Sequence, residues 1–463
     1  MPSMSRAITR VVAGLAVFAL AGCNADRLNV PNFNSPGTEA ATRDPRSAVV
    51  FQVNGILDAA RAQQPGYLSG VGIMGRESFN YTPQEGRNTS GYLIDPDNPT
   101  SFSAGVSFAA RYANARNIYN LLQLADAAAG LTDAEKAGIR GFGRTMLALE
   151  YHYVLATRDQ LGMPVELSDD PSAIFPFVSR DSAYNYIKAE LNGARTDLQA
   201  AGATFPFTLT TGFAGFTTPA TFAQFNRALL ARVEVYHATA GCGTPCYTSA
   251  LAALGESFIN ASGDLAAGVY HVYAIAPESP NTINSTTNRD VLAHPSIRAD
   301  QQTGDVRYAA KVAPIAAPRP PGGGVAGITS DLGFIRYPLQ TSPIPIIRNE
   351  ELILLRAEAR YFTGDVAGAL SDLNAVRTRS GSLTAGGAFT SDANFIDRLL
   401  YERRYSLLLE GHRWFDVRRL GRLDSLPLDH PTHTRAANFV IPQGECQVRT
   451  NTGNSALFGP GCP

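Results

Sequence analysis

Two helix-forming patterns, separated by only three residues, constrain the fold of this chain more than any other feature. Apolar residues recur at intervals of three or four along each pattern, first at Leu352, Leu355, Ala359 and Phe362, then at Val366, Leu370, Leu373 and Val376. This spacing places each set on one face of an α-helix. Gly364 ends the first helix, and Asp365 is placed to cap the second. Two antiparallel helices joined by so short a turn form the unit that tetratricopeptide-type solenoids stack.

Similar patterns predict further helical pairs earlier in the chain. Residues 108–165 contain two apolar faces, and a capping box from Thr132 to Glu135 precedes the second. Thr218 caps a later helix that has proline at its first position. We expect about four divergent pairs, within residues 108–262 and 348–420. The predicted fold is mostly α, a tetratricopeptide-like α/α superhelix with long irregular loops and minor β-structure.

Long irregular stretches lie between and after the helical patterns. They are rich in Gly, Pro, Asn, Thr and aromatic residues, and they span 66–104, 203–218, 266–347 and the C-terminal tail 423–463. Their aromatic content argues against plain disorder. Loops laid over a rigid scaffold commonly carry binding sites, so we expect the ligand-facing surface in the first three stretches.

A dense cluster of charged residues follows the last helical pair. Its members are Glu402, Arg403, Glu410, Arg413 and Asp416. Residues at this helical spacing form ion pairs three or four positions apart. The alternative is a catalytic pair of acids, but so many arginines would lower the pKa of each carboxyl and disfavour a general acid. We therefore interpret the cluster as a structural ion-pair network.

The N-terminus has the pattern of an export signal. Arg6 and Arg10 precede an apolar run, residues 11–20, that is too short to span a bilayer. The run ends in Leu20-Ala21-Gly22-Cys23, which resembles a bacterial lipoprotein cleavage site. An ordinary signal peptide with a cysteine by chance is the alternative.

Cleavage at this site would remove a signal peptide, residues 1–22, and leave 23–463 as a single domain. Cys23 would then carry the lipid, and two or more acyl chains anchor a protein stably. Asn24 follows Cys23, where an aspartate often marks retention in the inner membrane, so we expect anchoring to the lipid of the outer membrane. No apolar stretch after Cys23 approaches membrane-spanning length.

Four cysteines remain after Cys23. An even number in an exported chain indicates disulfides, most simply Cys242–Cys246 and Cys446–Cys462. A zinc site formed by all four is the alternative, although the spacing lacks the paired C-x₂-C knuckles of such sites.

Composition and motifs argue against several classes of function. The net charge of −1 comes without a basic block, which excludes nucleic acid as an expected partner. The chain has no H-E-x-x-H, G-x-S-x-G or Walker A sequence. We therefore expect neither catalytic residues nor a metal or cofactor, and the protein is not predicted to be an enzyme.

Three blocks in the C-terminal third resemble the signature of the SusD/RagB family of outer-membrane nutrient-binding lipoproteins. They are residues 350–359, which end in Leu-Leu-Arg-Ala-Glu-Ala, residues 373–381, and residues 402–419, from Glu-Arg-Arg to Asp-Val-Arg-Arg. Residues 28–32 and 439–442 also fit the family pattern, except that Gln443 stands where relatives usually have an acid.

The resemblance implies a function in nutrient uptake. Such a protein is expected on the cell surface, where it binds a glycan or peptide oligomer and delivers it to a SusC-like TonB-dependent barrel. A helical-repeat scaffold for envelope proteins and a helical-toroid glycoside hydrolase are the alternatives. The only tryptophan, Trp414, lies in the charged cluster, so a starch-type arc of aromatic rings is in doubt.

Residues 76–92 are our first choice for the ligand site. In related proteins the segment between the lipidated N-terminus and the first helical pair commonly contributes to the binding face. Here it offers aromatic faces and hydrogen-bonding groups together: Arg76, Phe79, Asn80, Tyr81, Arg87, Asn88 and Tyr92. The competing interpretation is that Phe79 and Tyr92 only pin the loop to the helices. Tyr270, Tyr273 and the 281–308 loop are the second choice.

Overall fold

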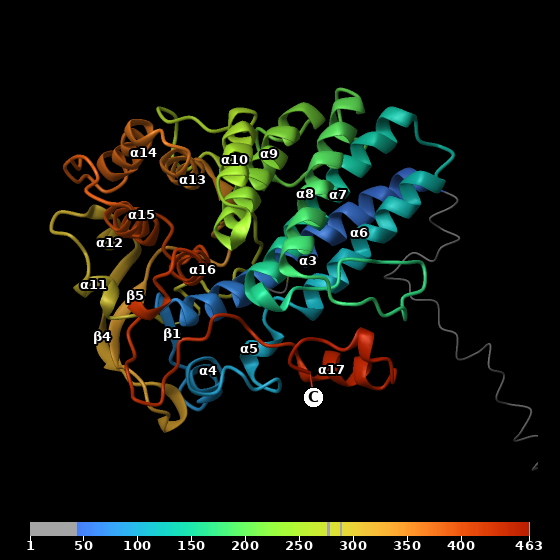
Figure 1. Ribbon diagram of the computed structural model, residues 1–463. Helices are drawn as coiled ribbons and strands as arrows, with labels where there is room; N and C mark the ends of the chain where they lie inside the picture. Colours follow the sequence, from blue (N-terminus) through green and yellow to red (C-terminus); the bar gives the residue numbers. More distant parts are fainter. Residues whose placement is uncertain (1–43, 276–277, 288, 463) are drawn as a thin grey trace, which may run out of the picture.

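The computed structural model describes residues 44–275, 278–287 and 289–462, so the predicted signal peptide and Cys23 lie outside the described residues. Helices make up most of the described chain, as predicted, and successive helices pack against one another in chain order (Figure 1). The stacked helices are α3 (Pro45–Met74), α6 (Ala109–Ala127), α7 (Asp133–Arg158), α8 (Arg180–Ala200), α9 (Pro219–His237), α10 (Thr244–Gly255), α13 (Asn349–Phe362) and α14 (Val366–Arg379).

Two further helices turn back toward the start of the stack. α15 (Asp392–Ser406) packs on α13 and α14, and α16 (Arg413–Arg419) packs on both α15 and α3. At the contact with α3, a Cβ on Gly75 would come 2.9 Å from the backbone nitrogen of Trp414. Glycine therefore allows the end of α3 to approach α16 closely, which brings segments distant in sequence together.

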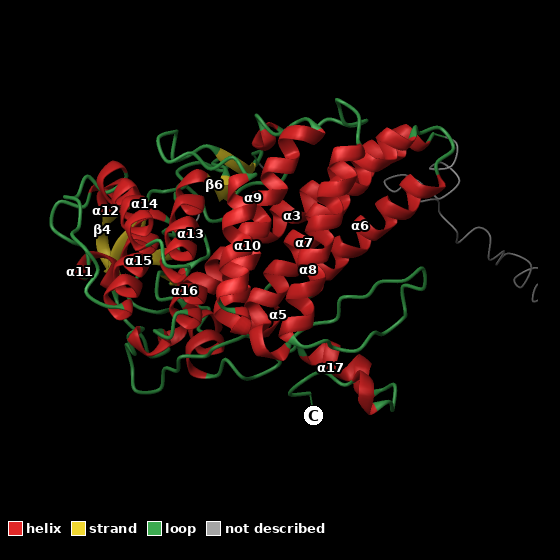
Figure 2. Ribbon diagram, turned by 45° about the horizontal axis from the view of Figure 1, so that its top comes forward, coloured by secondary structure: helices red, strands yellow, loops and turns green. Residues whose placement is uncertain are grey.

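The β-structure lies mainly in the long insertion between α10 and α13. A four-stranded antiparallel sheet has the order β1-β3-β5-β4, and a second sheet pairs β2 with β6. Figure 2 shows β4 at the end of the molecule that carries α11 (Ser296–Ala299) and α12 (Val306–Lys311). The strands are β1 (Ser78–Asn80), β2 (Gly268–His271), β3 (Val291–Ala293), β4 (Val312–Arg319), β5 (Ser330–Phe334) and β6 (Ile344–Arg348).

Local signals in the sequence correctly located several helix ends. The Thr132–Glu135 capping box forms at α7, and the side chain of Thr218 accepts a hydrogen bond from the backbone of Thr221 at α9. Gly364 adopts a φ of +93° between α13 and α14, and Asp365 accepts from the backbone N–H of Gly368 at 2.9 Å. The short turn between these two helices is therefore the predicted one.

The predicted boundaries of two irregular stretches were wrong. The stretch 66–104 begins inside α3 and also contains β1 and the short helices α4 (Arg87–Thr89) and α5 (Phe102–Gly105). The tail 423–463 contains the helix α17 (Gln443–Thr450). The elements within these two stretches depend on packing against distant parts of the chain, which local sequence patterns do not reveal.

The buried apolar residues form one cluster that runs from Val49 in α3 to Cys446 in α17. The cluster includes residues of both sheets and of every long helix, so the insertion packs on the same core as the helices. Among the described helices, none combines the length and apolar character needed to cross a membrane.

A buried ion pair joins α9 to α13 inside this core. The Nε and Nη2 groups of Arg232 donate to the two carboxylate oxygens of Glu351 at 2.7 and 2.6 Å. The two side chains are only 3% and 2% exposed, and Arg232 also donates to the carbonyl of Ile346. This two-point geometry fixes the register of one helix against the other.

We expect Glu351→Ala to lower the free energy of unfolding by about 3–5 kcal/mol, because it leaves the guanidinium of Arg232 buried without its counter-charge. Chemical denaturation of the purified protein would measure the change. The matched control is Asp397→Ala, which breaks an exposed pair with Arg422 and should cost at most about 1 kcal/mol. Equal losses in the two variants would contradict a special contribution from the buried pair.

Candidate functional site

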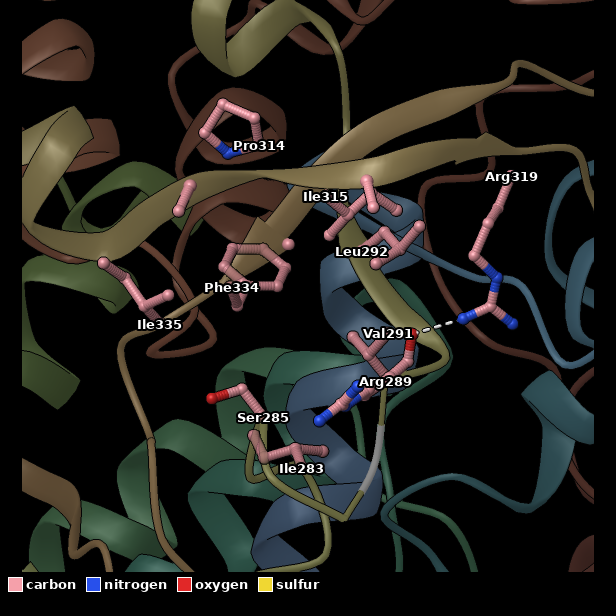
Figure 3. A pocket seen from close by; sticks show the side chains of 13 residues that line it. Ile283, Ser285, Arg289, Val291, Leu292, Pro314, Ile315, Arg319, Phe334 and Ile335 are labelled. Atoms are coloured by element: carbon pink, nitrogen blue, oxygen red, sulfur yellow. Dashed lines mark hydrogen bonds between the residues drawn. The ribbon is translucent and has the colours of Figure 1, made fainter.

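A groove lies beside the four-stranded sheet and is lined mainly by the insertion between α10 and α13. It encloses about 440 Å³, within the range typical of ligand sites. Strands β3, β4 and β5 supply most of its lining, and the loop before β3 supplies the rest (Figure 3). The apolar lining includes Ile283, Val291, Leu292, Pro314, Ile315 and Ile335.

Gly333 helps to shape this groove from the middle of the sheet. It pairs with Leu292 of β3 on one side and with Ala313 of β4 on the other. A Cβ at Gly333 would come 2.8 Å from the Cγ2 atom of Ile315, which lines the groove. A larger residue here would therefore displace Ile315 and change the shape of the groove.

Hydrogen-bonding groups gather at one side of the groove. Arg289 is exposed, and within the described chain its guanidinium forms no ion pair. Figure 3 shows Arg289 and Ser285 on the same side, away from Pro314. Arg319 is fixed in place, because it donates to Asp290 at 2.6 Å and to the carbonyl of Tyr81 at 2.9 Å. Arg289 is thus the charged side chain best placed to contact a ligand.

A second hollow, of about 370 Å³, lies next to β6 and is lined by Tyr270, Lys311, Arg336 and Arg348. Its charged groups already have partners: Arg348 and Arg336 both pair with Glu410. Lys311 donates to the backbone carbonyl of Tyr405, and burial lowers the pKa of this lysine. The hollow therefore offers fewer free hydrogen-bonding groups than the groove.

The charged cluster predicted from the sequence is largely buried and paired. Glu402 binds Arg307 and Arg377, and Arg403 binds Asp416 at 2.6 Å. Burial alone would raise the pKa of Glu410, but Arg336 and Arg348 lower it to about 2. Each of these carboxylates is paired with arginine, which is a structural arrangement.

Arg413 departs from the prediction, since within the described residues it forms no ion pair shorter than 4 Å, and its Nε has no hydrogen-bond partner. Burial lowers the pKa of Arg413 to about 10, and the carboxyl that most opposes this shift is Glu77, which is only 1% exposed. Burial in turn raises the pKa of Glu77 to about 8, against the influence of Arg413 and Arg404. The spacing of Arg413 in the sequence predicted that it would lie beside the other charged residues. In the structure, α16 directs its side chain toward the end of α3 instead.

The lowered pKa of Glu410 predicts a loss of stability in acid. A carboxyl whose pKa falls from 4.5 to about 2 on folding stabilises the fold above pH 4.5, and this contribution disappears as the pH falls toward 2. The contribution is on the order of 3 kcal/mol.

We expect Glu410→Gln to be less stable than the unmodified protein at pH 7, and the difference to shrink steadily as the pH falls from about 4.5 toward about 2. Denaturant titrations at several pH values would measure this. A difference that stays constant over the whole range would show that the Glu410 charge does not stabilise the fold.

Four of the seven residues of the first-choice ligand site are buried. Phe79 lies in β1, and its ring meets that of His294 edge to face at 5.2 Å. Arg76 donates to three backbone carbonyls, including that of Thr434 at 2.7 Å, while Tyr81 donates to the carbonyl of Ile328. Tyr92 packs against Phe439. These side chains pin the segment to the core, as the competing interpretation proposed, and they present little surface to a ligand.

The other three residues of that segment are more accessible. Asn80 is half-buried, and its Oδ1 accepts a hydrogen bond from the Thr82 hydroxyl at 2.7 Å. Arg87 is exposed, pairs with Glu85 and lies 4.5 Å from the ring of Phe102. Asn88 is half-buried. None of them lines the groove, so a ligand role for them remains a prediction.

The second-choice residues lie closer to the two hollows. The 281–308 loop supplies Ile283, Ser285, Arg289, Val291 and Leu292 to the groove, and Tyr270 lines the second hollow. Tyr273 is buried and donates to the carbonyl of Arg61. The groove could not be found from sequence because strand pairing alone brings 283–292, 313–319 and 333–335 together.

Both predicted disulfides are present, and the four-cysteine zinc site is therefore not formed. Cys242 is bonded to Cys246, and Cys446 to Cys462. The first closes the turn between α9 and α10, and the second ties the C-terminal tail to α17.

Comparison with known families gives one match. Residues 330–454 match the model of the SusD family. The matched region includes the charged cluster and the α13–α14 pair that the sequence pattern singled out. No curated protein sequence matches the chain.

Several solved structures share the fold over almost the whole chain. NanU from B. fragilis matches with a TM-score of 0.67 and 15% identity over 93% of this chain and 100% of its own. Surface glycan-binding protein A from Bacteroides thetaiotaomicron, solved in complex with laminarihexaose, gives 0.68 and 16% over 90% and 99%. A laminarin-binding SusD-like protein gives 0.62 and 16% over 87% and 97%. At identities this low, the structural similarity establishes a common fold and no more.

Proposed function

The chain belongs to the SusD/RagB family, and from that premise we propose that it is a cell-surface lipoprotein that binds an oligosaccharide. We further propose that it passes this ligand to a SusC-like TonB-dependent barrel in the outer membrane. The observation that carries the proposal is the groove beside the four-stranded sheet, which combines an apolar wall with the exposed guanidinium of Arg289.

The chemistry of the groove favours binding over hydrolysis. Glycoside hydrolases need two carboxyl groups that flank the scissile bond. None of the described residues that line the groove is an aspartate or glutamate. Arg289 instead supplies hydrogen-bond donors, which suit the hydroxyl and ring oxygens of a sugar. The Ser285 hydroxyl donates to the carbonyl of Tyr337 at 3.5 Å and can accept a hydrogen bond from a sugar hydroxyl.

The apolar wall of the groove also limits which kind of oligosaccharide can bind. Phe334 is the only aromatic residue that lines the groove among those described, and it is 5% exposed. Its ring therefore offers no broad face for stacking on a pyranose. Aliphatic contacts with Ile315 and Ile335, together with hydrogen bonds at the rim, would select a ligand that does not depend on aromatic stacking.

We expect Arg289→Ala to weaken oligosaccharide binding by about tenfold or more, because a hydrogen bond to a charged group contributes about 1.5–3 kcal/mol. Ala316→Trp should also weaken binding, since it places a large side chain in the groove from an exposed position on β4. Calorimetric titration of a panel of oligosaccharides against the purified protein would measure both effects.

Arg87→Ala tests the rival site in residues 76–92, because Arg87 is an exposed arginine of that segment outside the groove. It should leave the affinity unchanged. If Arg87→Ala abolishes binding while Arg289→Ala and Ala316→Trp do not, the site lies in residues 76–92 and the groove proposal is wrong. Binding of peptides in place of sugars would change the ligand class but keep the groove as its site.

The proposed membrane anchoring depends on Cys23, the residue that follows the predicted signal peptide. We expect Cys23→Ala to move the protein from outer-membrane fractions into soluble ones, because the thioether to lipid can no longer form. The unmodified protein, extracted with detergent, should co-purify with a TonB-dependent barrel. Persistence of the Cys23→Ala protein in salt-washed membranes would contradict lipid anchoring.

A further inference from the structure

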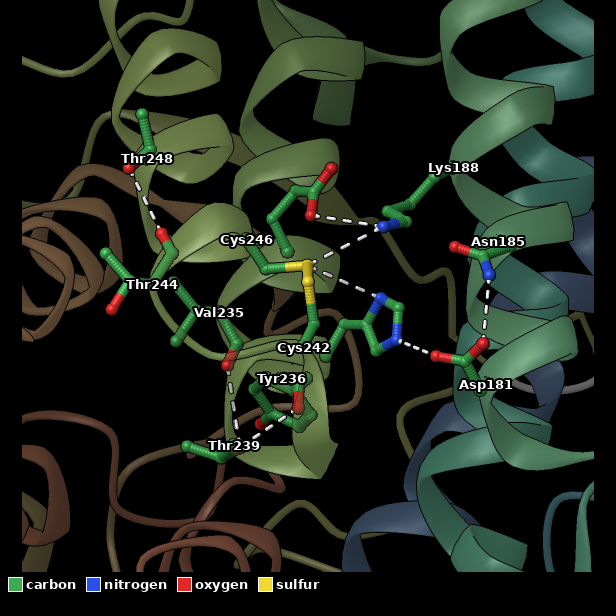
Figure 4. Close-up of a disulfide and its surroundings, with 12 residues drawn as sticks. Asp181, Asn185, Lys188, Val235, Tyr236, Thr239, Cys242, Thr244, Cys246 and Thr248 are labelled. Atoms are coloured by element: carbon green, nitrogen blue, oxygen red, sulfur yellow. Dashed lines mark hydrogen bonds and ion pairs between the residues drawn. A yellow bond between two sulfur atoms is a disulfide. The ribbon is translucent and has the colours of Figure 1, made fainter.

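Three helices meet around the Cys242–Cys246 disulfide (Figure 4). Neither cysteine lines the groove. His237 is the last residue of α9, and the tight turn that follows contains Gly241 and Gly243 at φ values of 131° and 65°. These two glycines flank Cys242, which is half-buried, whereas Cys246 is buried in the first turn of α10. The turn therefore folds the two cysteines back over the end of α9.

The imidazole of His237 is held in one orientation next to the disulfide. Its Nε2 hydrogen-bonds the Oδ1 of Asp181 on α8 at 2.7 Å, and its ring stacks on Tyr184 at a centroid distance of 4.8 Å. The other ring nitrogen, Nδ1, lies 3.5 Å from the sulfur of Cys246. A histidine whose second nitrogen binds a carboxylate is the usual arrangement at metal sites, where the carboxylate orients the ligand.

The distances fit a tetrahedral zinc site. With Zn–S of about 2.3 Å and Zn–N of about 2.0 Å, sulfur and nitrogen ligands lie about 3.5 Å apart. His237 Nδ1 and the Cys246 sulfur already have this separation, and the ligand atoms of His237, Cys242 and Cys246 all lie within 4.8 Å of one another. Only the sulfur of Cys242 has to move away from that of Cys246, to about 3.8 Å, and the adjacent glycines permit this.

We propose that reduction of the Cys242–Cys246 disulfide creates a binding site for Zn²⁺. His237 Nδ1 and the two thiolates would be the ligands, Asp181 would orient the imidazole, and the fourth position would be left to water. The reductant is a phosphine or a dithiol. The disulfide gains two electrons and two protons to give two thiols, and Zn²⁺ then displaces the two thiol protons into solvent.

The surroundings of this disulfide also favour its reduction. The half-buried sulfur of Cys242 is the accessible point of attack, so Cys246 is the group that leaves. The ammonium of Lys188 lies 3.7 Å from the Cys246 sulfur and stabilises the thiolate that forms there. By contrast, no charged side chain of the described chain lies within hydrogen-bonding distance of either sulfur of Cys446–Cys462.

The test uses the full chain, purified in detergent and treated with a phosphine under anaerobic conditions. A phosphine reduces the disulfide and takes up the oxygen of one water molecule, and it adds no thiol that would compete for the metal. After equilibration with Zn²⁺ and dialysis, we expect about one zinc per chain in the reduced protein and none in the oxidised protein. Alkylation and mass spectrometry of the peptides would identify the free cysteines, and Co²⁺ in place of Zn²⁺ should show thiolate-to-metal charge-transfer absorption.

Variants separate the proposed ligands from general effects on folding. Cys242→Ser combined with Cys246→Ser should abolish zinc binding, whereas Cys446→Ser combined with Cys462→Ser should retain it. Asp181→Asn should weaken binding by about 10–100-fold, because the carboxylate orients His237. Asp181 is exposed and in the first turn of α8, so Asp133→Asn, exposed in the first turn of α7, is its matched control and should have no effect.

Two results would overturn the proposal. One is a protein whose Cys242 and Cys246 are shown to be reduced but that holds no more zinc than the oxidised form. The other is zinc binding that is unchanged in His237→Asn and Asp181→Asn. Neither result bears on oligosaccharide binding, because none of these residues lines the groove.

Discussion

The guanidinium of Arg348 is the junction on which the rest of the architecture depends. It lies where β6 ends and α13 begins, donates to Glu410 at 2.9 Å and to the carbonyl of Ser406 at 2.6 Å, and also pairs with Glu350. These contacts join the sheet insertion, the α13–α14 pair and the turn between α15 and α16 at one point. Because the group is buried, removing Glu410 or Glu350 leaves its charge only partly compensated and destabilises the junction.

This junction also determines where the groove can form. Arg336 follows β5 closely in the chain and pairs with the same carboxylate, Glu410, as Arg348 does. Glu410 thus ties the strand that lines the groove to the helices that form the core. The groove is consequently built on a rigid base, although its rim consists of loops, and such support is what precise ligand contacts require.

The helical pairs, their caps and both disulfides could be predicted from sequence because each depends on residues close together in the chain. α3 escaped prediction for a physical reason: its second half is largely buried and contains Pro65, so it shows neither a clear apolar stripe nor an uninterrupted helical pattern. Phe79 looked like a loop residue because its strand pairs with β3, roughly two hundred positions later. The groove depends on the same long-range pairing, so its residues could be named only as part of a second-choice loop.

The ligand specificity of the groove can vary without a change in the contacts between the helices. The groove residues come from the insertion between α10 and α13, yet these two helices pack directly against each other. The helical stack is therefore continuous without the insertion, although buried groove residues such as Leu292 and Phe334 belong to the same core as the helices. Substitutions at exposed wall positions such as Ile335 and Arg289 would alter the ligand surface without breaking a helix–helix contact. A scaffold of this kind can keep one fold while its ligand changes, because the exposed wall positions can be substituted while the buried residues beneath them hold the sheet on the core.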